Sequence, residues 1–289
     1  MPKKEASQIS KLVLGSVQFG MHYGISNQHG SPEDIELEKL LRAAKEAGIA
    51  CIDTAAAYGK AEERLGKYAS DFELITKLKS GTTAQNLQSN FEESLRRLKR
   101  SSVKALMFHD FNDWRANPEL WLELKKLRAK HKTTQIGFSL YDPEELSLLI
   151  EADVIPDIVQ VPFNLFDRRF EACASIFEKH QIEVHTRSVF LQGLLFFKAA
   201  DLPKHFQSIQ EKQKGFYDWL ASKGRSVLEV SLAHALNQSW IDRVLIGVST
   251  SHELEENLAS LNTIDSADLK ELSFMSESNP EIINPSKWK

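Results

Sequence analysis

The stretch Ile49–Lys77, which reads IACIDTAAAYGKAEERLGKYASDFELITK, decides the fold of this protein. It begins with a short apolar run, Ile49–Thr54, that contains β-branched residues, and it ends with a second such run, Glu73–Lys77. The segment between them, Ala61–Ala69, has the length and residue spacing of a helix. Two strands joined through a helix are typical of a parallel sheet, because the chain must return along the sheet before the next strand starts.

The same alternation of strand and helix continues along the chain, in eight units. The strand-like runs are Lys11–Val17, Ile49–Thr54, Glu73–Lys77, Ala105–His109, Gln135–Ser139, Ile158–Pro162, Glu183–Ser188 and Arg243–Val248. The helical segments are Ile35–Ala47, Ala61–Ala69, Thr83–Lys99, Glu119–His131, Glu144–Ile150, Arg169–His180, Val227–Asn237 and Glu253–Leu261. Apolar residues between Leu37 and Ala44 recur at steps of three and four, as in an amphipathic helix. Because eight strand–helix units close a barrel, we predict an α/β fold of the (β/α)8, or TIM-barrel, type.

An open, doubly wound sheet is the main alternative fold. Such a sheet carries a Gly-x-Gly-x-x-Gly turn after its first strand, where it holds a dinucleotide. The corresponding segment here, Gly15–Gly20, reads GSVQFG and has its glycines at the wrong spacing. The sequence therefore favours the barrel.

The organisation of the chain points to one domain that covers residues 1–289, because no linker-like segment divides it. The connection after the seventh strand is longer than the others. It contains an extra segment, Ala199–Gly224, with its own helical piece around Gln207–Leu220. We expect this insertion to lie on the catalytic rim of the barrel and to shape the substrate site as a lid.

Two helix starts carry capping signals. Ser31 is followed by Pro32 and two acidic residues, and Asp142 is followed by Pro143 and two acidic residues. A serine or aspartate cap, proline at the first position and acids in the first turn all favour a helix N-terminus.

Composition excludes several classes of protein. Hydrophobic residues make up 42% of the 289 positions and charged residues 26%, with a net charge of −4, so no basic excess favours nucleic acid. The two cysteines, Cys51 and Cys173, form no metal or disulfide pattern, and we predict that both are buried. No apolar run reaches the roughly 18 residues that span a membrane, and no signal segment follows Met1. We therefore expect a cytoplasmic protein.

Four polar residues follow three successive predicted strands. Asp53 ends the second strand and Tyr58 lies in the loop after it, while Lys77 ends the third strand and His109 the fourth. In such barrels the active site lies at these strand ends. A phenol titrates near 10, and a neighbouring ammonium would lower that pKa so that the phenol can exchange a proton. A carboxylate would hold the ammonium, and a histidine would orient the substrate.

Taken singly, each of these residues has a structural explanation, such as a loop cap, a packed aromatic ring, a surface charge or a core histidine. A glycosidase barrel is another possibility, but it needs paired carboxylates near the strand ends. Only Asp53 and Asp110 qualify, and Asp53 is better placed to pair with Lys77. The joint occurrence of four residues at adjacent strand ends favours proton-transfer chemistry.

These residues also carry a family resemblance over nearly the whole chain. The segment Ile52–Gly59 (IDTAAAYG), followed by Glu62–Gly66 (EERLG), resembles the signature of the aldo-keto reductases. Further landmarks of that family are matched in order by Ile75–Leu78, Met107–Asp110, Val159–Leu165, Ile246–Gly247 and Leu254–Leu258. The resemblance implies an NAD(P)(H)-dependent oxidoreductase that reduces an aldehyde or ketone, including sugar-type carbonyls, by hydride transfer without a metal.

The resemblance also implies roles for the four residues. Tyr58 would be the general acid during reduction and the base during oxidation. Lys77 would tune Tyr58, Asp53 would pair with Lys77, and His109 would orient the carbonyl group. Two other functions stay open: an aldose or alcohol dehydrogenase that runs in the oxidative direction, and a cofactor-binding sensor or accessory subunit with little turnover.

Cofactor-binding residues follow from the same resemblance. Ser139 and Gln160 would hold the nicotinamide carboxamide, and Ser188 would lie near the pyrophosphate. The remaining candidates, at the seventh strand end and in the eighth loop and helix, are Arg187, Gly247, Ser249, Glu253 and Asn257. Three positions depart from the family pattern: Leu140 replaces an asparagine, Arg187 replaces an aromatic residue that stacks on the nicotinamide, and Ser249 replaces a basic residue. A planar guanidinium can also stack on a ring.

The eighth loop bears on the choice of cofactor. The resemblance implies NADP(H), but Gly247–Glu253 contains no Arg or Lys to bind a 2′-phosphate. Glu253 would repel that phosphate or accept a hydrogen bond from the 2′-hydroxyl of NAD. Alternatively, Thr250 and Glu253 form a capping box that turns the glutamate back onto the helix. We therefore expect that NAD(H) is usable.

The resemblance implies that the substrate is a small carbonyl compound. It specifies neither the compound nor the oligomeric state. Candidate substrate residues are Phe19, His22 and Tyr23 in the first loop and Trp114 after the fourth strand. Phe111, Phe190 and the pair Phe196-Phe197 are further candidates, with simple loop packing as the alternative.

Overall fold

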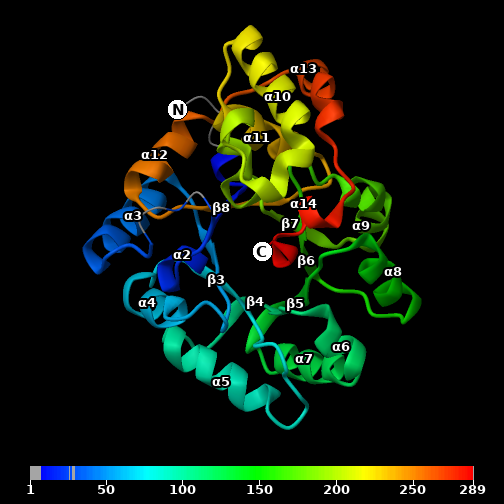
Figure 1. The fold of residues 1–289 in the computed structure, drawn as a ribbon. Helices are drawn as coiled ribbons and strands as arrows, with labels where there is room; N and C mark the ends of the chain where they lie inside the picture. The colour runs from blue at the N-terminus through cyan, green and yellow to red at the C-terminus, as the bar shows by residue number, and fades with distance from the viewer. Residues whose placement is uncertain (1–7, 26, 28–29, 289) are drawn as a thin grey trace.

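Eight parallel strands form a closed barrel in chain order, which confirms the predicted (β/α)8 fold (Figure 1). The computed structural model describes residues 8–25, 27 and 30–288. The strands are β1 Leu12–Gly15, β2 Cys51–Asp53, β3 Glu73–Lys77, β4 Val103–Phe108, β5 Thr133–Ser139, β6 Ile158–Pro162, β7 Glu183–Arg187 and β8 Arg243–Gly247. The barrel closes through pairing of β1 with β8, with Gly15 opposite Gly247.

Helices surround the barrel and cover its outer face (Figure 1). The α-helices are α2 Val17–Gly20, α3 Asp34–Ala47, α4 Ala61–Tyr68, α5 Leu87–Leu98, α6 Phe111–Ala116, α7 Leu120–Ala129, α8 Pro143–Glu151, α9 Ala174–His180, α10 Gln210–Lys223, α11 Val227–Leu236, α12 Ser251–Ala259, α13 Ser266–Glu271 and α14 Pro280–Ile283. Within the described residues, no helix has both the length and the apolar character needed to cross a membrane.

One of the two predicted helix caps is correct. Asp142 and Glu145 form a capping box at the start of α8. The prediction for Ser31 is wrong, because α3 begins at Asp34 with Glu33 at the N-cap. The Pro32 carbonyl accepts a hydrogen bond of 2.6 Å from Arg64 on α4, which ties this segment to another helix before α3 begins.

The barrel interior is layered, because alternate side chains of each strand point inward. A middle layer of apolar residues fills the barrel: Val13, Cys51, Ile75, Ala105, Met107, Ile158 and Leu245. Polar residues lie at the carboxyl ends of the strands above this layer and at the amino ends below it. Cys51 and Cys173 are both buried and free, as predicted. This apolar layer separates the two polar ends of the barrel.

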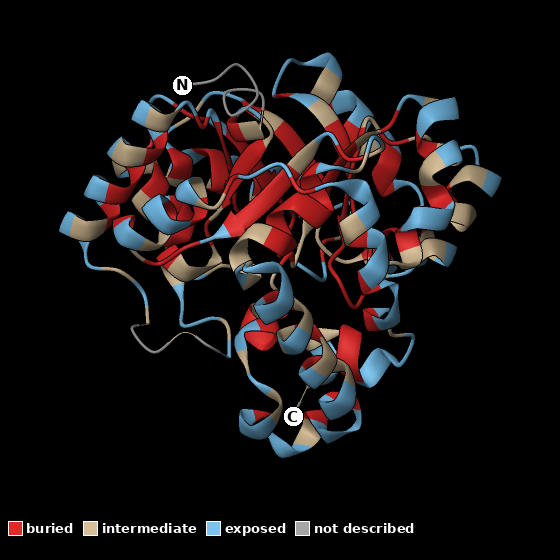
Figure 2. Ribbon diagram, turned by 90° about the horizontal axis from the view of Figure 1, so that it is seen from above, coloured by how far each residue is buried: buried red, intermediate tan, exposed pale blue. Residues whose placement is uncertain are grey.

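A second hydrophobic core lies beside the barrel. We call it the terminal lobe; it is built from residues 199–224, between β7 and β8, and residues 264–288. Its core includes Phe206, Phe216 and Leu220 from the first segment and Leu269 and Leu272 from the second. Figure 2 shows the lobe projecting from one face of the barrel, with the C-terminus inside it. The helix expected near Gln207–Leu220 is α10; a lid function for this segment stays a prediction.

Candidate active site

A buried ion pair lies at the centre of the carboxyl end of the barrel. Lys77 Nζ lies 2.5 Å from Asp53 Oδ1 and donates a further hydrogen bond of 3.0 Å to the Thr54 carbonyl. Gln160 Nε2 donates to the other carboxylate oxygen of Asp53 at 2.9 Å. The side chains of Lys77 and Asp53 are 1% and 2% exposed. Both carboxylate oxygens are therefore hydrogen-bonded, as a buried charge requires.

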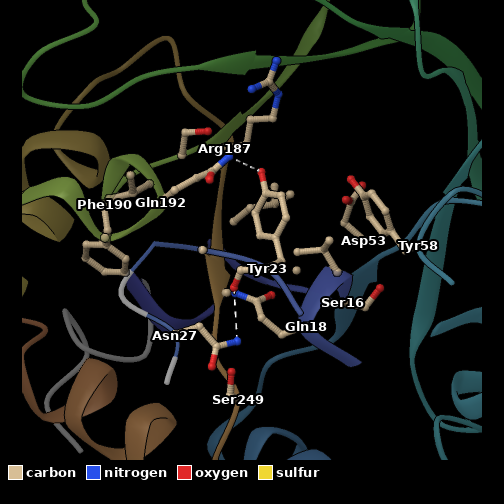
Figure 3. A pocket seen from close by; sticks show the side chains of 18 of the residues that line it. Ser16, Gln18, Tyr23, Asn27, Asp53, Tyr58, Arg187, Phe190, Gln192 and Ser249 are labelled. Atoms are coloured by element: carbon tan, nitrogen blue, oxygen red, sulfur yellow. Dashed lines mark hydrogen bonds between the residues drawn. The ribbon is translucent and has the colours of Figure 1, made fainter. Parts of the chain in front are cut away.

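Tyr58 and His109 lie against this pair. The Lys77 ammonium is 5.3 Å from the centroid of the Tyr58 ring, and the rings of Tyr58 and His109 meet edge to face with their centroids 5.5 Å apart. In Figure 3, Tyr58 and Asp53 face the same cavity. The four residues predicted from three strand ends are thus brought together.

Two glycines allow the Tyr58 loop to pack in this position. A Cβ atom on Gly20 would lie 1.8 Å from the Tyr58 carbonyl oxygen. Gly59 has a φ of +55°, and a Cβ atom there would lie 2.4 Å from the Gly20 carbonyl oxygen. Since no side chain fits at either contact, the approach of α2 to the Tyr58 turn depends on both glycines.

The electrostatics of Tyr58 differ from the expectation. Burial raises the pKa of Tyr58 above its usual value, the charge of Asp53 raises it further, and the charge of Arg187 opposes the rise. The net shift is opposite to the lowering that we expected from Lys77, because burial has the largest effect; a role of Lys77 in tuning Tyr58 stays a prediction. Burial also lowers the pKa of Lys77, against the effect of Asp53. Tyr58 is consequently a protonated phenol at neutral pH.

His109 is neutral at physiological pH. Burial, followed by the charges of Lys77 and Arg187, lowers its pKa to about 4. Its Nδ1 atom is buried without a hydrogen-bond partner among the described residues. A neutral imidazole beside a phenol can hydrogen-bond a substrate oxygen without adding charge.

A cavity of 600 Å³ extends from these residues to the eighth loop. All eight predicted cofactor residues line it: Ser139, Gln160, Arg187, Ser188, Gly247, Ser249, Glu253 and Asn257. Gln18 Oε1 and Asn257 Oδ1, both on residues of the lining, are buried without a partner in the described part of the chain. Buried polar atoms of this kind call for a ligand or water, so the cavity fits a dinucleotide.

Two carboxylates accept hydrogen bonds from backbone amides of the eighth loop. Glu253 Oε2 accepts the Ser249 amide at 2.6 Å, while the Glu253 amide donates to Thr250 Oγ1 at 3.1 Å. Glu253 therefore turns back onto the segment before α12, but only the Thr250 half of the expected capping box is present, because the carboxylate accepts the Ser249 amide and not the Thr250 amide. Glu36 on α3 accepts the Ser251 amide at 2.6 Å, a contact 215 positions apart in the sequence that no local pattern could reveal.

Arg187 stacks on a residue that sequence reasoning missed. Its guanidinium carbon lies 4.1 Å from the centroid of the Tyr141 ring, and Nη2 donates to the Leu140 carbonyl at 3.1 Å. Tyr141 lines the same cavity. The guanidinium therefore stacks on Tyr141. Leu140, which replaces the family's asparagine, holds the guanidinium through its backbone carbonyl.

The predicted substrate residues separate into two groups. Tyr23 lines the cavity, as do Phe190 and Phe196. Phe19 and Trp114 do not: both are buried in the hydrophobic core, Phe19 from the short helix α2 and Trp114 among Phe111 and Phe138. The assignment of these two residues to substrate contact is wrong, because their side chains turn inward to pack. His22 is exposed and lies outside the lining.

The first and seventh loops join over the cavity. Gln192 Nε2 donates to the Tyr23 hydroxyl at 2.7 Å, as Figure 3 shows, and the Ile25 amide donates to the Gln192 carbonyl at 3.0 Å. Ser188, Leu191 and Gln192 all have positive φ, at 62°, 46° and 52°. Left-handed backbone in non-glycine residues is strained and often occurs at functional sites.

Several known proteins are similar to this chain. The aldo-keto reductase YhdN of Bacillus subtilis is 26% identical, over 89% of each chain, and the L-glyceraldehyde 3-phosphate reductase of Escherichia coli is 24% identical, over 83% of each. The holo form of an aldo-keto reductase from Bacillus halodurans superposes with a TM-score of 0.77 at 17% identity, covering 96% of this chain and 95% of that one. A glycerol dehydrogenase from Gluconobacter oxydans gives a TM-score of 0.72 at 22% identity, over 92% and 90%.

The match to the family model covers most of the chain. The model described as the aldo/keto reductase family matches residues 11–276, a range that contains the buried ion pair, Tyr58, His109 and the whole cavity lining. Members of this family use NAD(P)H in general and act on carbonyl compounds. The chain therefore belongs to the aldo/keto reductase family and is an oxidoreductase.

Proposed function

We propose that this protein reduces an aldehyde or ketone, including sugar-type carbonyls, with Tyr58 as the general acid. The observation that carries the proposal is the buried Asp53–Lys77 pair beneath a protonated Tyr58 in a dinucleotide-sized cavity. A cytoplasmic location and a single domain over residues 1–289 stay predictions from the sequence.

The chain's own residues perform the proton transfer. A nicotinamide cofactor, when bound by the lining residues, supplies the hydride. His109 orients the carbonyl oxygen, and Tyr58 donates its phenolic proton to that oxygen as negative charge develops on it. The tyrosinate that remains is stabilised by the Lys77 ammonium, which Asp53 holds in place.

Replacing Tyr58 by phenylalanine tests this assignment. Because the phenolic proton serves only the chemical step, we expect Tyr58→Phe to lower kcat by about two decades or more and to leave the Kd of the reduced cofactor nearly unchanged. Tyr68→Phe is the matched control, since its hydroxyl donates to Asp34 on the surface. A Tyr58→Phe variant that keeps more than half of the wild-type turnover, with chemistry rate-limiting, would contradict the proposal.

Kinetic measurements on the wild-type protein separate the two alternative functions. A dehydrogenase would oxidise a sugar or alcohol with the same residues, and the ratio of forward to reverse turnover measures that direction. A sensor or accessory subunit would bind cofactor but show slow hydride exchange across a broad aldehyde panel. The complete set of four residues favours an enzyme, because cofactor binding alone gives no reason for Tyr58 and Lys77.

We further propose that NAD(H) is the preferred cofactor. Glu253 and Glu36 both accept backbone amides at the start of α12, where a 2′-phosphate would require amides and basic side chains. The hydrogen bond from Ser251 also lowers the pKa of Glu36, so its carboxylate stays charged. A 2′-phosphate near these two acids would be repelled.

Titration of NADH and NADPH at moderate salt tests this preference. We expect NADH to bind at least as tightly as NADPH, and Glu36→Gln or Glu253→Gln to tighten NADPH binding relative to NADH. Glu38→Gln, on the exposed face of α3 beside Arg42, is the control. Wild-type NADPH binding that is tighter than NADH binding would overturn the preference, and a difference of more than about a hundredfold, roughly 2.7 kcal/mol, would also mean that NAD(H) is hardly usable.

A further inference from the structure

One cation in the cavity has no acidic partner. Arg187 is half-buried at the end of β7, and its guanidinium makes one hydrogen bond, from Nη2 to the Leu140 carbonyl. Within the described residues, no carboxylate forms an ion pair with it, and Nε and Nη1 have no hydrogen-bond partner. A partly desolvated guanidinium of this kind is costly unless an anion accompanies it.

The nearby acids are all committed to other partners. Burial raises the pKa of Glu145, against a small opposing effect of Arg187, and its carboxylate accepts the backbone amides of Tyr141 and Asp142 at 2.6 and 3.2 Å. Asp142 pairs with Arg169. Asp53 is held by Lys77 and Gln160. No internal rearrangement of these groups neutralises Arg187 without breaking an existing contact.

The two ends of the cavity carry opposite charges. Arg187 and Tyr141 lie at the catalytic end, where the charge of Arg187 also reaches Tyr58 and His109. Glu253 and Glu256 line the other end, beside Ser249. Figure 3 shows Arg187 and Ser249 at opposite ends of the labelled residues. An anionic group is therefore attracted to the catalytic end and repelled from the eighth loop.

We propose that Arg187 binds an acidic group of the substrate, so that the preferred substrates are carbonyl compounds that also carry a carboxylate or a phosphate. This inference rests on the proposed reductase function and names its substrate class. The Tyr141 ring fixes the plane of the guanidinium, and the Nε hydrogen, the Nη1 hydrogens and one Nη2 hydrogen remain for an oxyanion. A guanidinium of fixed orientation can bind two oxygens of one carboxylate or phosphate.

Matched pairs of aldehydes test the proposal in the holoenzyme. Succinic semialdehyde with butanal, and para-carboxybenzaldehyde with benzaldehyde, compare a carboxylate with a neutral group. Glyceraldehyde 3-phosphate with glyceraldehyde makes the comparison for a phosphate. We expect kcat/KM to favour the acidic member by about tenfold or more in the carboxylate pairs, the phosphate pair or both, mainly through KM; the pair with the larger ratio identifies the acidic group.

Variants of Arg187 connect this preference to the residue. Arg187→Met should bring the ratio of kcat/KM within each pair close to one, whereas Arg187→Lys should keep part of the preference, because it retains the charge but loses the planar fork. Arg42→Met is the matched control: it removes one positive charge from a side chain that is 69% exposed on α3. We expect the wild-type ratio in that control.

The outcomes distinguish this inference from the proposed function. If neither member of any pair is reduced, the reductase proposal itself fails. If both members are reduced with equal kcat/KM in every pair, the reductase proposal stands and the role of Arg187 is overturned. If Arg187→Met weakens NADH binding and lowers kcat/KM by the same factor for every substrate, Arg187 serves the cofactor and the inference is also overturned.

Discussion

Two lysine–carboxylate pairs lie at opposite ends of the same barrel, and they differ in almost every respect. At the carboxyl end, Lys77 contacts Asp53 at 2.5 Å with side chains 1% and 2% exposed. At the amino end, Lys104 contacts Glu73 at 3.1 Å with side chains 19% and 57% exposed. Glu73 and Lys77 are the first and last residues of one strand, β3.

The difference supports the proposal that the carboxyl end of the barrel carries the chemistry. Burying two charges costs free energy that their attraction only partly returns, so an ion pair is retained in the interior when it has another role. The exposed pair needs no such explanation, because solvent screens it. The buried pair supports Tyr58 and His109, whereas Glu73 and Lys104 contact neither of them.

Removing the lysine from each pair should give the largest contrast. Lys77→Met leaves Asp53 charged and unpaired, and we expect a loss of about 3–5 kcal/mol in the free energy of unfolding and a fall of about two decades in kcat. Lys104→Met should cost at most about 1 kcal/mol and leave kcat unchanged. Urea denaturation and steady-state kinetics measure both.

A double variant keeps this comparison testable if Lys77→Met does not fold. Asp53→Asn with Lys77→Met removes both charges, so stability should largely recover while activity stays low. A double variant that regains wild-type kcat would mean that the ion pair serves only the fold.

Glycine replacements sharpen the comparison at a smaller scale. Gly20→Ala places a Cβ atom against the Tyr58 carbonyl, so we expect lower kcat together with lower stability. Gly48, which follows α3 toward the amino end, has a φ of +97° and no atom closer than 4.0 Å to an added Cβ. Gly48→Ala should cost about 1–2 kcal/mol in stability and leave kcat unchanged. Equal effects on kcat would show that Gly20 does not position Tyr58.

The two ends should also differ, more weakly, in their pH dependence. His109 has a pKa lowered to about 4 from 6.5, so the unfolded chain takes up its proton first and stability falls as the pH drops from 6.5 to 4. At the amino end, the hydrogen bond with His185 lowers the pKa of Glu183 from 4.5 to about 2. Its stabilisation is present above pH 4.5 and is lost as the pH falls from 4.5 toward 2.

Denaturation curves across pH test both assignments. His109→Gln should reduce the decrease in unfolding free energy between pH 6.5 and 4, and Glu183→Gln should reduce the decrease below pH 4.5. A His109→Gln protein with the same slope as the wild type would show that another group, such as the buried His234, causes the loss.

The sequence predicted the barrel and the four central residues because both depend on short-range order. Strand runs with polar ends place Asp53, Lys77 and His109 at one rim, whatever the details of packing. The Thr250 cap at the start of α12 was also visible as a local pattern. By contrast, the contact between Glu36 and Ser251 joins two helices that only the closed barrel brings together.

Side-chain direction explains the errors. Phe19 and Trp114 lie near strand ends, as Tyr23 does, but hydrophobicity alone does not say whether an aromatic ring faces a cavity or the core. The raised pKa of Tyr58 could not be predicted for a related reason, because the degree of burial depends on packing from several elements. The stacking of Arg187 on Tyr141 likewise could not be predicted, because it depends on how close the end of β7 lies to the loop after β5.

The terminal lobe has a consequence for the synthesis of the chain. Phe216 and Leu220 leave the ribosome before β8, but their partners Leu269 and Leu272 follow about fifty residues later. At about 5–20 residues per second, the apolar face of α10 waits a few seconds for its cover. During that interval this part of the core is closed only by residues that precede α10, such as Leu194, Leu195 and Phe206, so the lobe becomes complete only when the last segment of the chain has been made.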